Sequence, residues 1–219
     1  MLVDTDQDLD FWREAFKSLQ VCTRILDITH TQISLSLPST VPCTFKMKPT
    51  IPAAPTLPTF LYGTLMSPQV LSTLLGRSLR DDEEKAILPA RLFGHARHCV
   101  KNHVFPATIP ASKDDCVDGL LLPPTLSPTE VNLLDYFEGE EYLRVTVPVQ
   151  VKNNSDKTST EFTTVDAQAY LWRDDLVSQL VFQPWSYEDF VSNHLEWYLQ
   201  HTVRPCRQEM ERLGMTQRK

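Results

Sequence analysis

Residues 133–144 read Leu-Leu-Asp-Tyr-Phe-Glu-Gly-Glu-Glu-Tyr-Leu-Arg, and they mark the place where a predicted helix gives way to a predicted strand. Glu138 ends the apolar helix, after Phe137 and before a chain-turning Gly139. Partial burial at such a place would raise the pKa of the carboxyl group toward the range that is useful for proton transfer. Glu138 is therefore a candidate general acid/base, and a solvated acidic turn is the alternative.

The helix that ends at Glu138 has a distinct start. Residues 127–130, Ser-Pro-Thr-Glu, are typical of a capping box with proline at the first helical position. Val131, Leu134 and Phe137 follow at three-residue spacing and predict the buried stripe of the helix. The local sequence thus predicts that Glu138 lies at the end of a helix.

Two segments after this helix predict a long hairpin. Apolar residues alternate with polar ones in residues 142–151 and again in residues 165–172. The polar residues 153–160 lie between the two segments, so we expect the two strands to pair with each other.

An earlier strand leads into a glycine turn. Residues 59–62, Thr-Phe-Leu-Tyr, predict a short strand that runs into residues 63–65, Gly-Thr-Leu, and a helix is expected from Ser67 to about Leu75. A glycine turn after a strand exposes consecutive backbone N–H groups that can bind a carboxylate or an oxyanion. An ordinary tight turn is the alternative interpretation.

The remaining elements complete an α+β pattern. Strands are predicted over residues 85–93, 97–101 and 117–122, and a further helix begins at Ser186 and ends before Pro205. The total is a sheet-dominated α+β domain whose strands could close into a small barrel. No sequence repeat is present.

The chain is expected to have three parts. Residues 1–55 form an N-terminal extension with an amphipathic helix and a proline-rich connector, residues 56–203 form the main domain, and residues 204–219 form a charged, frayed C-terminal tail. The predicted helix of the extension carries an apolar stripe of Leu9, Trp12, Phe16 and Leu19. The extension could be a belt packed on the main domain or a surface for a partner, and the belt is favoured because its aromatic residues would otherwise be exposed.

Composition limits the classes of function. The 219 residues have a formal net charge of -7, and their basic residues are scattered, so we expect neither nucleic acid nor an anionic membrane as a partner. The apolar runs are too short to span a bilayer, and the acidic N-terminus does not resemble a signal peptide, which favours a cytoplasmic protein. The five cysteines are widely spaced and are expected to be reduced thiols.

Metal and nucleotide sites are not favoured. His95, His98, Cys99 and His103 lie close in sequence, but on a strand His95 and His98 would face opposite sides, and no acidic ligand pattern accompanies them. The chain has only six glycines and contains neither a phosphate-binding loop nor a Gly-x-Ser-x-Gly elbow.

Taken together, the glycine turn and the stretch around Glu138 resemble the gamma-glutamylcyclotransferase superfamily, and in particular its plant and fungal avirulence-induced-gene-like branch. The resemblance extends from about residue 59 to residue 200 and leaves residues 1–55 outside. The matching segments are Phe60-Leu61-Tyr62-Gly63-Thr64-Leu65, Phe105-Pro106-Ala107-Thr108-Ile109, Gly119-Leu120-Leu121, residues 134–144, and Ala169-Tyr170-Leu171-Trp172.

The resemblance implies a small mixed β-barrel with flanking helices. It implies that Tyr62, Gly63, Thr64 and Leu65 hold the glutamyl group of a substrate and that Glu138 is the general acid/base. The α-amine of a γ-glutamyl compound would attack its own γ-carbonyl and release 5-oxoproline, so that no metal, cofactor or nucleophilic side chain is required. The expected substrate is a small γ-glutamyl amine, peptide or conjugate, which could derive from glutathione.

Several points stay open at this stage. Tyr142 and Tyr170 are candidate substrate-binding residues, and packing in the core is the alternative for both. Glu140 and Glu141 would raise the pKa of Glu138 if they lie close to it, whereas Arg144 would lower it. The protein could instead catalyse another proton transfer on a small metabolite, or bind ligands or partners without catalysis. The leaving group and the oligomeric state are not predicted.

Overall fold

The computed structural model describes residues 57–152 and 162–216. All of these belong to one compact unit. The predicted extension of residues 1–55, with its amphipathic helix and proline-rich connector, lies outside the described residues. Its role as a belt or partner surface stays a prediction, as does the domain boundary near residue 56.

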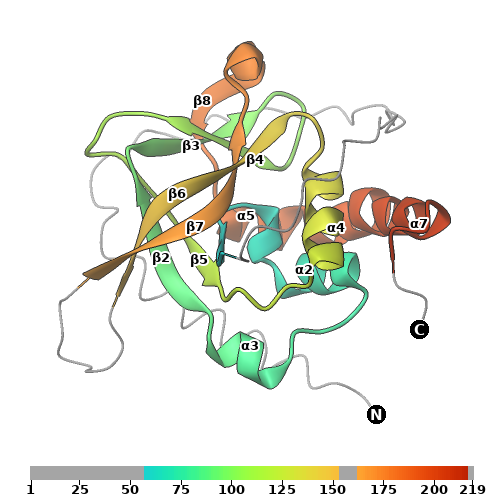
Figure 1. The fold of residues 1–219 in the computed structure, drawn as a ribbon. Helices are drawn as coiled ribbons and strands as arrows, with labels where there is room; N and C mark the ends of the chain where they lie inside the picture. The colour runs from blue at the N-terminus through green and yellow to red at the C-terminus, as the bar shows by residue number, and fades with distance from the viewer. Residues whose placement is uncertain (1–56, 153–161, 217–219) are drawn as a thin grey trace. The chain divides into compact units, whose positions relative to one another are not determined.

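Five strands close into a barrel in the order β1-β5-β2-β6-β7 (Figure 1). Strand β1 pairs with β7 in parallel, and the other pairs of the barrel are antiparallel. This confirms the predicted α+β fold with a small mixed barrel. The strands are β1 (Thr59–Leu61), β2 (Leu88–Phe93), β5 (Cys116–Leu122), β6 (Tyr142–Lys152) and β7 (Phe162–Trp172).

The predicted hairpin is the longest pair of the barrel. Strands β6 and β7 pair from Tyr142 opposite Trp172 to Lys152 opposite Phe162, without a break in register. Alternate residues such as Val147, Val149 and Val151 point into the barrel core. The period of two in the sequence therefore corresponds to an inner and an outer face.

A second, three-stranded antiparallel sheet has the order β4-β3-β8. It consists of β4 (Pro106–Pro110), β3 (His95–Val100) and β8 (Leu180–Pro184). The sequence did not predict β4 or β8, because their prolines indicate loops. Both are edge strands, where a proline that cannot donate a hydrogen bond to a neighbouring strand is tolerated.

Helix α2 (Pro68–Leu75) begins and ends as predicted. The Ser67 side chain accepts a hydrogen bond from the Val70 N–H, and Gly76 closes the helix in the left-handed conformation with φ 69°. The short helix α3 (Asp81–Lys85) was not predicted, because its acidic sequence has no apolar stripe.

Helix α4 (Pro128–Glu138) has the predicted capping box, in which the Ser127 hydroxyl and the Glu130 carboxylate each accept from the other residue's backbone N–H. The predicted buried stripe was only partly right. The most buried side chains are Leu133 and Leu134, whereas Val131 and Phe137 are half-buried. The helix thus buries a narrower face than its three-residue spacing indicates.

The C-terminal region differs from the prediction. In place of one helix and a frayed tail it contains α5 (Tyr187–Asn193), α6 (Leu195–Tyr198), a π-helical turn (Leu199–Val203) and α7 (Arg204–Arg212). Pro205 lies in the first turn of α7, where a proline needs no intrahelical hydrogen bond. Within the described ranges no helix is both long and apolar enough to cross a membrane.

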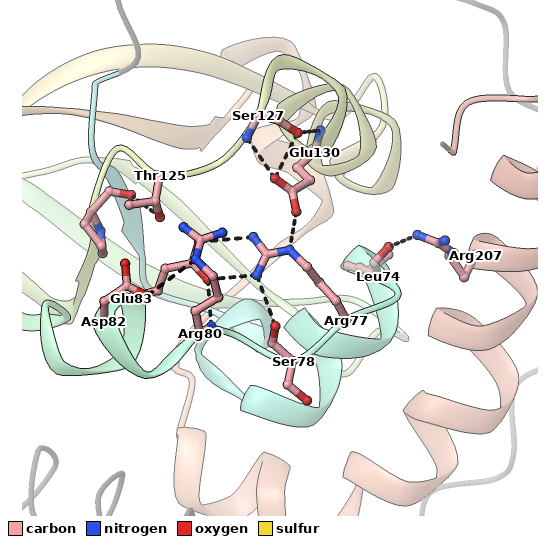
Figure 2. A network of polar contacts seen from close by, with 11 residues as sticks. Leu74, Arg77, Ser78, Arg80, Asp82, Glu83, Thr125, Ser127, Glu130 and Arg207 are labelled. Atoms are coloured by element: carbon pink, nitrogen blue, oxygen red, sulfur yellow. Dashed lines mark hydrogen bonds and ion pairs between the residues drawn. The ribbon is translucent and has the colours of Figure 1, made fainter. Parts of the chain in front are cut away.

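Ionic contacts join helices α2, α3 and α4 (Figure 2). The Arg77 guanidinium donates to Glu83 at 2.8 Å and to Glu130 at 2.5 Å. The Glu83 carboxylate, which is fully buried, also accepts from the Arg80 backbone N–H at 2.8 Å. From α7, Arg207 donates to the Leu74 carbonyl at the end of α2 at 2.6 Å. These contacts fix the start of α4, the helix that ends at Glu138.

Gly119 on β5 is a site of close backbone approach. A Cβ atom there would lie 2.3 Å from the Leu61 carbonyl oxygen and 2.7 Å from the Phe60 ring. We expect Gly119→Ala to lower the free energy of unfolding by about 3 kcal/mol, at the upper end of overpacking effects. Denaturant unfolding monitored by circular dichroism would measure the change.

Gly94→Ala is the matched control, because nothing lies within 4 Å of its Cβ position although its φ is +72°. Only the conformational cost of about 1 kcal/mol is expected there. Equal losses at the two positions would contradict the steric explanation for Gly119.

Candidate active site

Glu138 is the last residue of α4 and is half-buried. The chain leaves the helix at Gly139, whose φ of 71° favours glycine. Among the residues that the structure describes, none donates a hydrogen bond to the Glu138 carboxylate. Burial is the main cause that raises its pKa, and the negative charge of Asp135 adds to it, so that the pKa reaches about 8. A carboxyl group in this state can both take and return a proton near neutral pH.

Four buried tyrosines surround this carboxyl group. They are Tyr62, Tyr142, Tyr170 and Tyr198. Burial raises the pKa of each phenol, and the charge of Glu138 raises it further in all four. The phenols therefore stay protonated beside Glu138.

The hydroxyl protons of three of these tyrosines are directed to other acceptors. Tyr62 donates to the backbone carbonyl of Tyr170, and Tyr142 donates to the Pro106 carbonyl at 2.7 Å. Tyr170 donates to the Asp135 carboxylate at 2.9 Å. The tyrosines thus enclose Glu138 without donating to it, which explains why its charged form is poorly stabilised.

Asp135 links α4 to the barrel. The Arg144 Nε forms an ion pair with Asp135 Oδ1 at 2.9 Å, and Arg144 lies opposite Tyr170 in the β6–β7 ladder. Glu140 and Glu141, which the sequence offered as neighbours that would raise the pKa of Glu138, are exposed. Asp135 has this effect instead, because residues three apart share a helix face. Arg144 pairs with Asp135 and not with Glu138.

The turn after β1 is a short 3₁₀ helix, Thr64–Met66, with Gly63 at its start. Its backbone N–H groups at Gly63, Thr64 and Leu65 have no hydrogen-bond partner within the described parts of the chain, as expected for the first turn of a helix. A Cβ atom on Gly63 would lie 3.0 Å from Pro106 Cγ, so strand β4 packs directly against this turn.

Further residues border the turn. Arg97 on β3 donates to the Tyr62 carbonyl at 2.6 Å and lies over the Trp185 ring at 5.0 Å from its centre. The Tyr198 hydroxyl lies against the Thr64 hydroxyl. Because the charge of Glu138 also acts on Tyr198, this contact connects the turn to the carboxyl group.

The structure therefore brings the predicted residues Tyr62, Tyr142 and Tyr170 together around Glu138, next to the turn of residues 63–65. The Leu65 side chain is part of the core. Asp135, Arg97 and Tyr198 also lie at this site, and the sequence did not predict them. The helical spacing could have indicated Asp135, whereas Tyr198 lies in the region predicted as the helix from Ser186, and only the tertiary fold brings it to the site. In residues 57–152 and 162–216, no three His, Cys, Asp or Glu side chains gather as metal ligands would.

A family model described as "Gamma-glutamyl cyclotransferase, AIG2-like" matches residues 59–190. The chain belongs to this family. Its relatives include AIG2-like protein D of Arabidopsis thaliana, which is 33% identical over 145 residues, or 65% of this chain and 84% of that protein. AIG2-like protein A of the same plant is 27% identical over 157 residues, or 71% of this chain and 86% of that protein.

The solution structure of an Arabidopsis thaliana protein is similar to this chain. The two share 25% sequence identity, and the match covers 76% of this chain and 88% of that chain with a TM-score of 0.47. The family match covers the turn after β1 and the stretch that contains Glu138. It confirms the resemblance drawn from these two segments of the sequence.

The raised pKa of Glu138 predicts a specific pH dependence of stability. Its pKa is about 8 in the folded protein and 4.5 for an unperturbed carboxyl group, so the folded state holds the extra proton between these values. The contribution to stability is therefore present at low pH and is lost as the pH rises toward 8. Relative to Glu138→Gln, the wild-type free energy of unfolding should decline between about pH 5 and about pH 9.

Denaturant unfolding of both proteins at several pH values would measure this difference. Glu140→Gln removes an exposed carboxylate from the same turn and should follow the wild-type curve. Parallel curves for wild type and Glu138→Gln would show that Glu138 is not desolvated.

Proposed function

We propose that this protein is a γ-glutamyl cyclotransferase that releases 5-oxoproline and an amine from a small γ-glutamyl compound. The observation that carries the proposal is a half-buried carboxyl group, Glu138, with a pKa raised to about 8 beside a helical turn whose first N–H groups are unpaired. The family match supports the same class of reaction.

The reaction uses a nucleophile that the substrate itself supplies. The α-amine attacks the γ-carbonyl carbon, a C–N bond forms to close a five-membered lactam, and the C–N bond to the leaving amine breaks. Because both reacting groups belong to one molecule, the protein mainly has to hold a folded conformation of the substrate.

Glu138 carries the proton in this proposal. It takes one proton from the α-ammonium group, whose pKa is near 8, and it returns a proton to the departing amine. The attacking nitrogen loses a second proton as the lactam forms, and Glu138 takes this proton and releases it to water. A carboxyl group with a pKa near that of the amine can do both, whereas an ordinary carboxylate is a weaker base. The buried tyrosines limit the access of water to this proton.

The turn of residues 63–65 would stabilise the oxyanion that develops on the γ-carbonyl oxygen. Unpaired N–H groups of a buried turn are fixed donors that need no reorganisation during the reaction. Arg97, which donates to the Tyr62 carbonyl, fixes the peptide that contains the Gly63 N–H. Tyr142 and Tyr170 would form the wall of the substrate site.

Glu138→Gln tests the proposed acid/base role. Gln keeps the size of the side chain but cannot transfer the proton, so we expect the release of 5-oxoproline to fall by about 10²–10⁴-fold. The assay measures 5-oxoproline formed from a panel of γ-glutamyl amino acids and peptides. Glu140→Gln, an exposed change two residues away, should retain the wild-type rate.

An unchanged rate in Glu138→Gln would overturn the mechanism. The absence of 5-oxoproline from every substrate of the panel with the wild-type protein would overturn the proposed function. In that case another proton transfer or ligand binding without catalysis would be the better account of the site.

Asp135→Asn tests how the pKa of Glu138 is set. The negative charge of Asp135 raises this pKa, so its removal should lower it. The unprotonated form of Glu138 is the active one, and kcat/KM should therefore rise with pH through about 8 in the wild type and at lower pH in Asp135→Asn.

The pH profiles of kcat/KM are compared with one and the same substrate, so that the titration of the substrate contributes equally to each. Glu140→Gln should leave the rising limb of the profile in its place. A limb that did not move in Asp135→Asn would contradict the electrostatic role of Asp135.

A further inference from the structure

We propose that the Thr108 hydroxyl is a ligand-binding group that, together with the Tyr62 hydroxyl, accepts hydrogen bonds from the ammonium group of the ligand beside Glu138. This inference rests on the proposed function, because it names residues that would hold the α-ammonium group of a γ-glutamyl compound. Thr108 was part of a matching segment of the sequence, but no role had been assigned to it.

The Thr108 hydroxyl is buried and has no hydrogen-bond partner in the described part of the chain. Within the described residues, three buried side-chain atoms have no hydrogen-bond partner: Thr108 Oγ1, His98 Nδ1 and Trp172 Nε1. Thr108 is fully buried, and burying an unpaired hydroxyl costs about 1–3 kcal/mol. Such a group calls for an explanation, and a ligand that completes its hydrogen bonding is one.

Thr108 lies on strand β4, on the face that is directed to the candidate site. Pro106 lies two residues earlier, so both side chains lie on the same face of the strand. The Pro106 side chain faces the Gly63 turn, since a Cβ atom on Gly63 would lie 3.0 Å from its Cγ. Thr108 therefore also faces this side.

Contacts of strand β3 and of Tyr62 support this placement of Thr108. Arg97 lies directly opposite Thr108 in the β3–β4 ladder, and its guanidinium donates to the Tyr62 carbonyl. The side chain and the backbone N–H of Thr108 both lie against the Tyr62 hydroxyl. Even so, Thr108 Oγ1 does not reach hydrogen-bond geometry with Tyr62 or with any other group of the described residues. Of the other two side chains with an unpaired atom, His98 packs on Phe182 and Trp172 packs on Tyr142.

The polar groups near Thr108 suit a ligand group that donates hydrogen bonds. The Tyr62 hydroxyl donates its proton to the Tyr170 carbonyl, so its oxygen can only accept a further hydrogen bond. The Thr108 hydroxyl can accept as well, and the Glu138 carboxylate is the acidic group that acts on Tyr62. The nearest cation, Arg97, is engaged with backbone carbonyls. Acceptors together with a carboxylate suit an ammonium group, which has only donors.

Thr108→Val is expected to have opposite effects on the stability of the protein and on its binding of a ligand. Valine has nearly the same shape and suits a strand, but it lacks the hydroxyl. Removing an unpaired buried hydroxyl should leave the thermal stability unchanged or raise it, whereas it should weaken the binding of a ligand that carries an ammonium group. A residue with a purely structural role would lose stability instead.

The experiment measures the binding of two small ligands to the full-length protein by isothermal titration calorimetry. L-Glutamate carries the α-ammonium group, and glutarate is the same dicarboxylate without it. We expect Thr108→Val to bind L-glutamate about tenfold more weakly than the wild type does, as for the loss of one hydrogen bond to a charged group. Glutarate should bind equally to both proteins.

Thr108→Ser is the matched control, because it keeps the hydroxyl and loses only the methyl group. It should bind L-glutamate much as the wild type does. Melting temperatures of the three proteins without ligand complete the comparison, and a rise or no change in Thr108→Val supports the inference.

Three results would overturn the inference: a lower melting temperature in Thr108→Val than in Thr108→Ser, an equal loss of affinity for both ligands, or no preference of the wild type for L-glutamate over glutarate. These results are distinct from a failure of the proposed function. A wild-type protein that releases no 5-oxoproline but binds L-glutamate through Thr108 would keep the ammonium site and lose the cyclisation.

Discussion

The ion pairs of Arg77 fix helix α4, and the candidate site depends on this helix. Arg77 joins the fully buried Glu83 to Glu130 in the first turn of α4. Breaking a buried pair of this kind costs about 3–5 kcal/mol, because the partner that remains is a buried charge without compensation. The start of α4 is thus firmly held, and a rigid helix carries this constraint over eleven residues to Asp135 and Glu138. A site on a fixed helix can hold a reacting group more accurately than a loop can.

Two buried or half-buried glutamates at opposite ends of this assembly show how environment decides chemistry. Burial raises the pKa of Glu83, but the hydrogen bonds from Arg77 and from the Arg80 N–H outweigh it, and the pKa falls to about 2. Glu138 is desolvated without such donors, because the nearby tyrosines donate elsewhere, and its pKa rises to about 8. Glu83 is therefore suited to permanent charge and structural support, whereas Glu138 is suited to proton transfer.

The sequence predicted those parts of the fold that local signals determine. The capping box of α4, the Ser67 cap of α2 and the alternation of β6 and β7 each involve residues close in the chain, and the structure confirms all three. Strands β4 and β8 were missed, because proline marks a loop locally and is compatible with a strand only at the edge of a sheet. Tyr198 and Thr108 were missed for a related reason, since only the tertiary fold brings them to Tyr62 and Glu138.

Some residues of the candidate site are placed by local sequence and others only by the tertiary fold, and this difference affects which ligands the site could bind. Local sequence places the Glu138 carboxyl group at the end of α4 and the unpaired N–H groups in the turn after β1, which are the parts that the proposed intramolecular attack on a γ-carbonyl would use. The groups that border them come from elsewhere: Thr108 and Arg97 from the second sheet, and Tyr198 from the C-terminal helices. These residues, which are distant in sequence, would determine which polar groups of a ligand form hydrogen bonds. A buried hydroxyl that has no hydrogen-bond partner favours a ligand that supplies such a partner. The proposed reaction therefore rests on two short segments, whereas the choice of a substrate would depend on contacts that form only when the whole domain has folded.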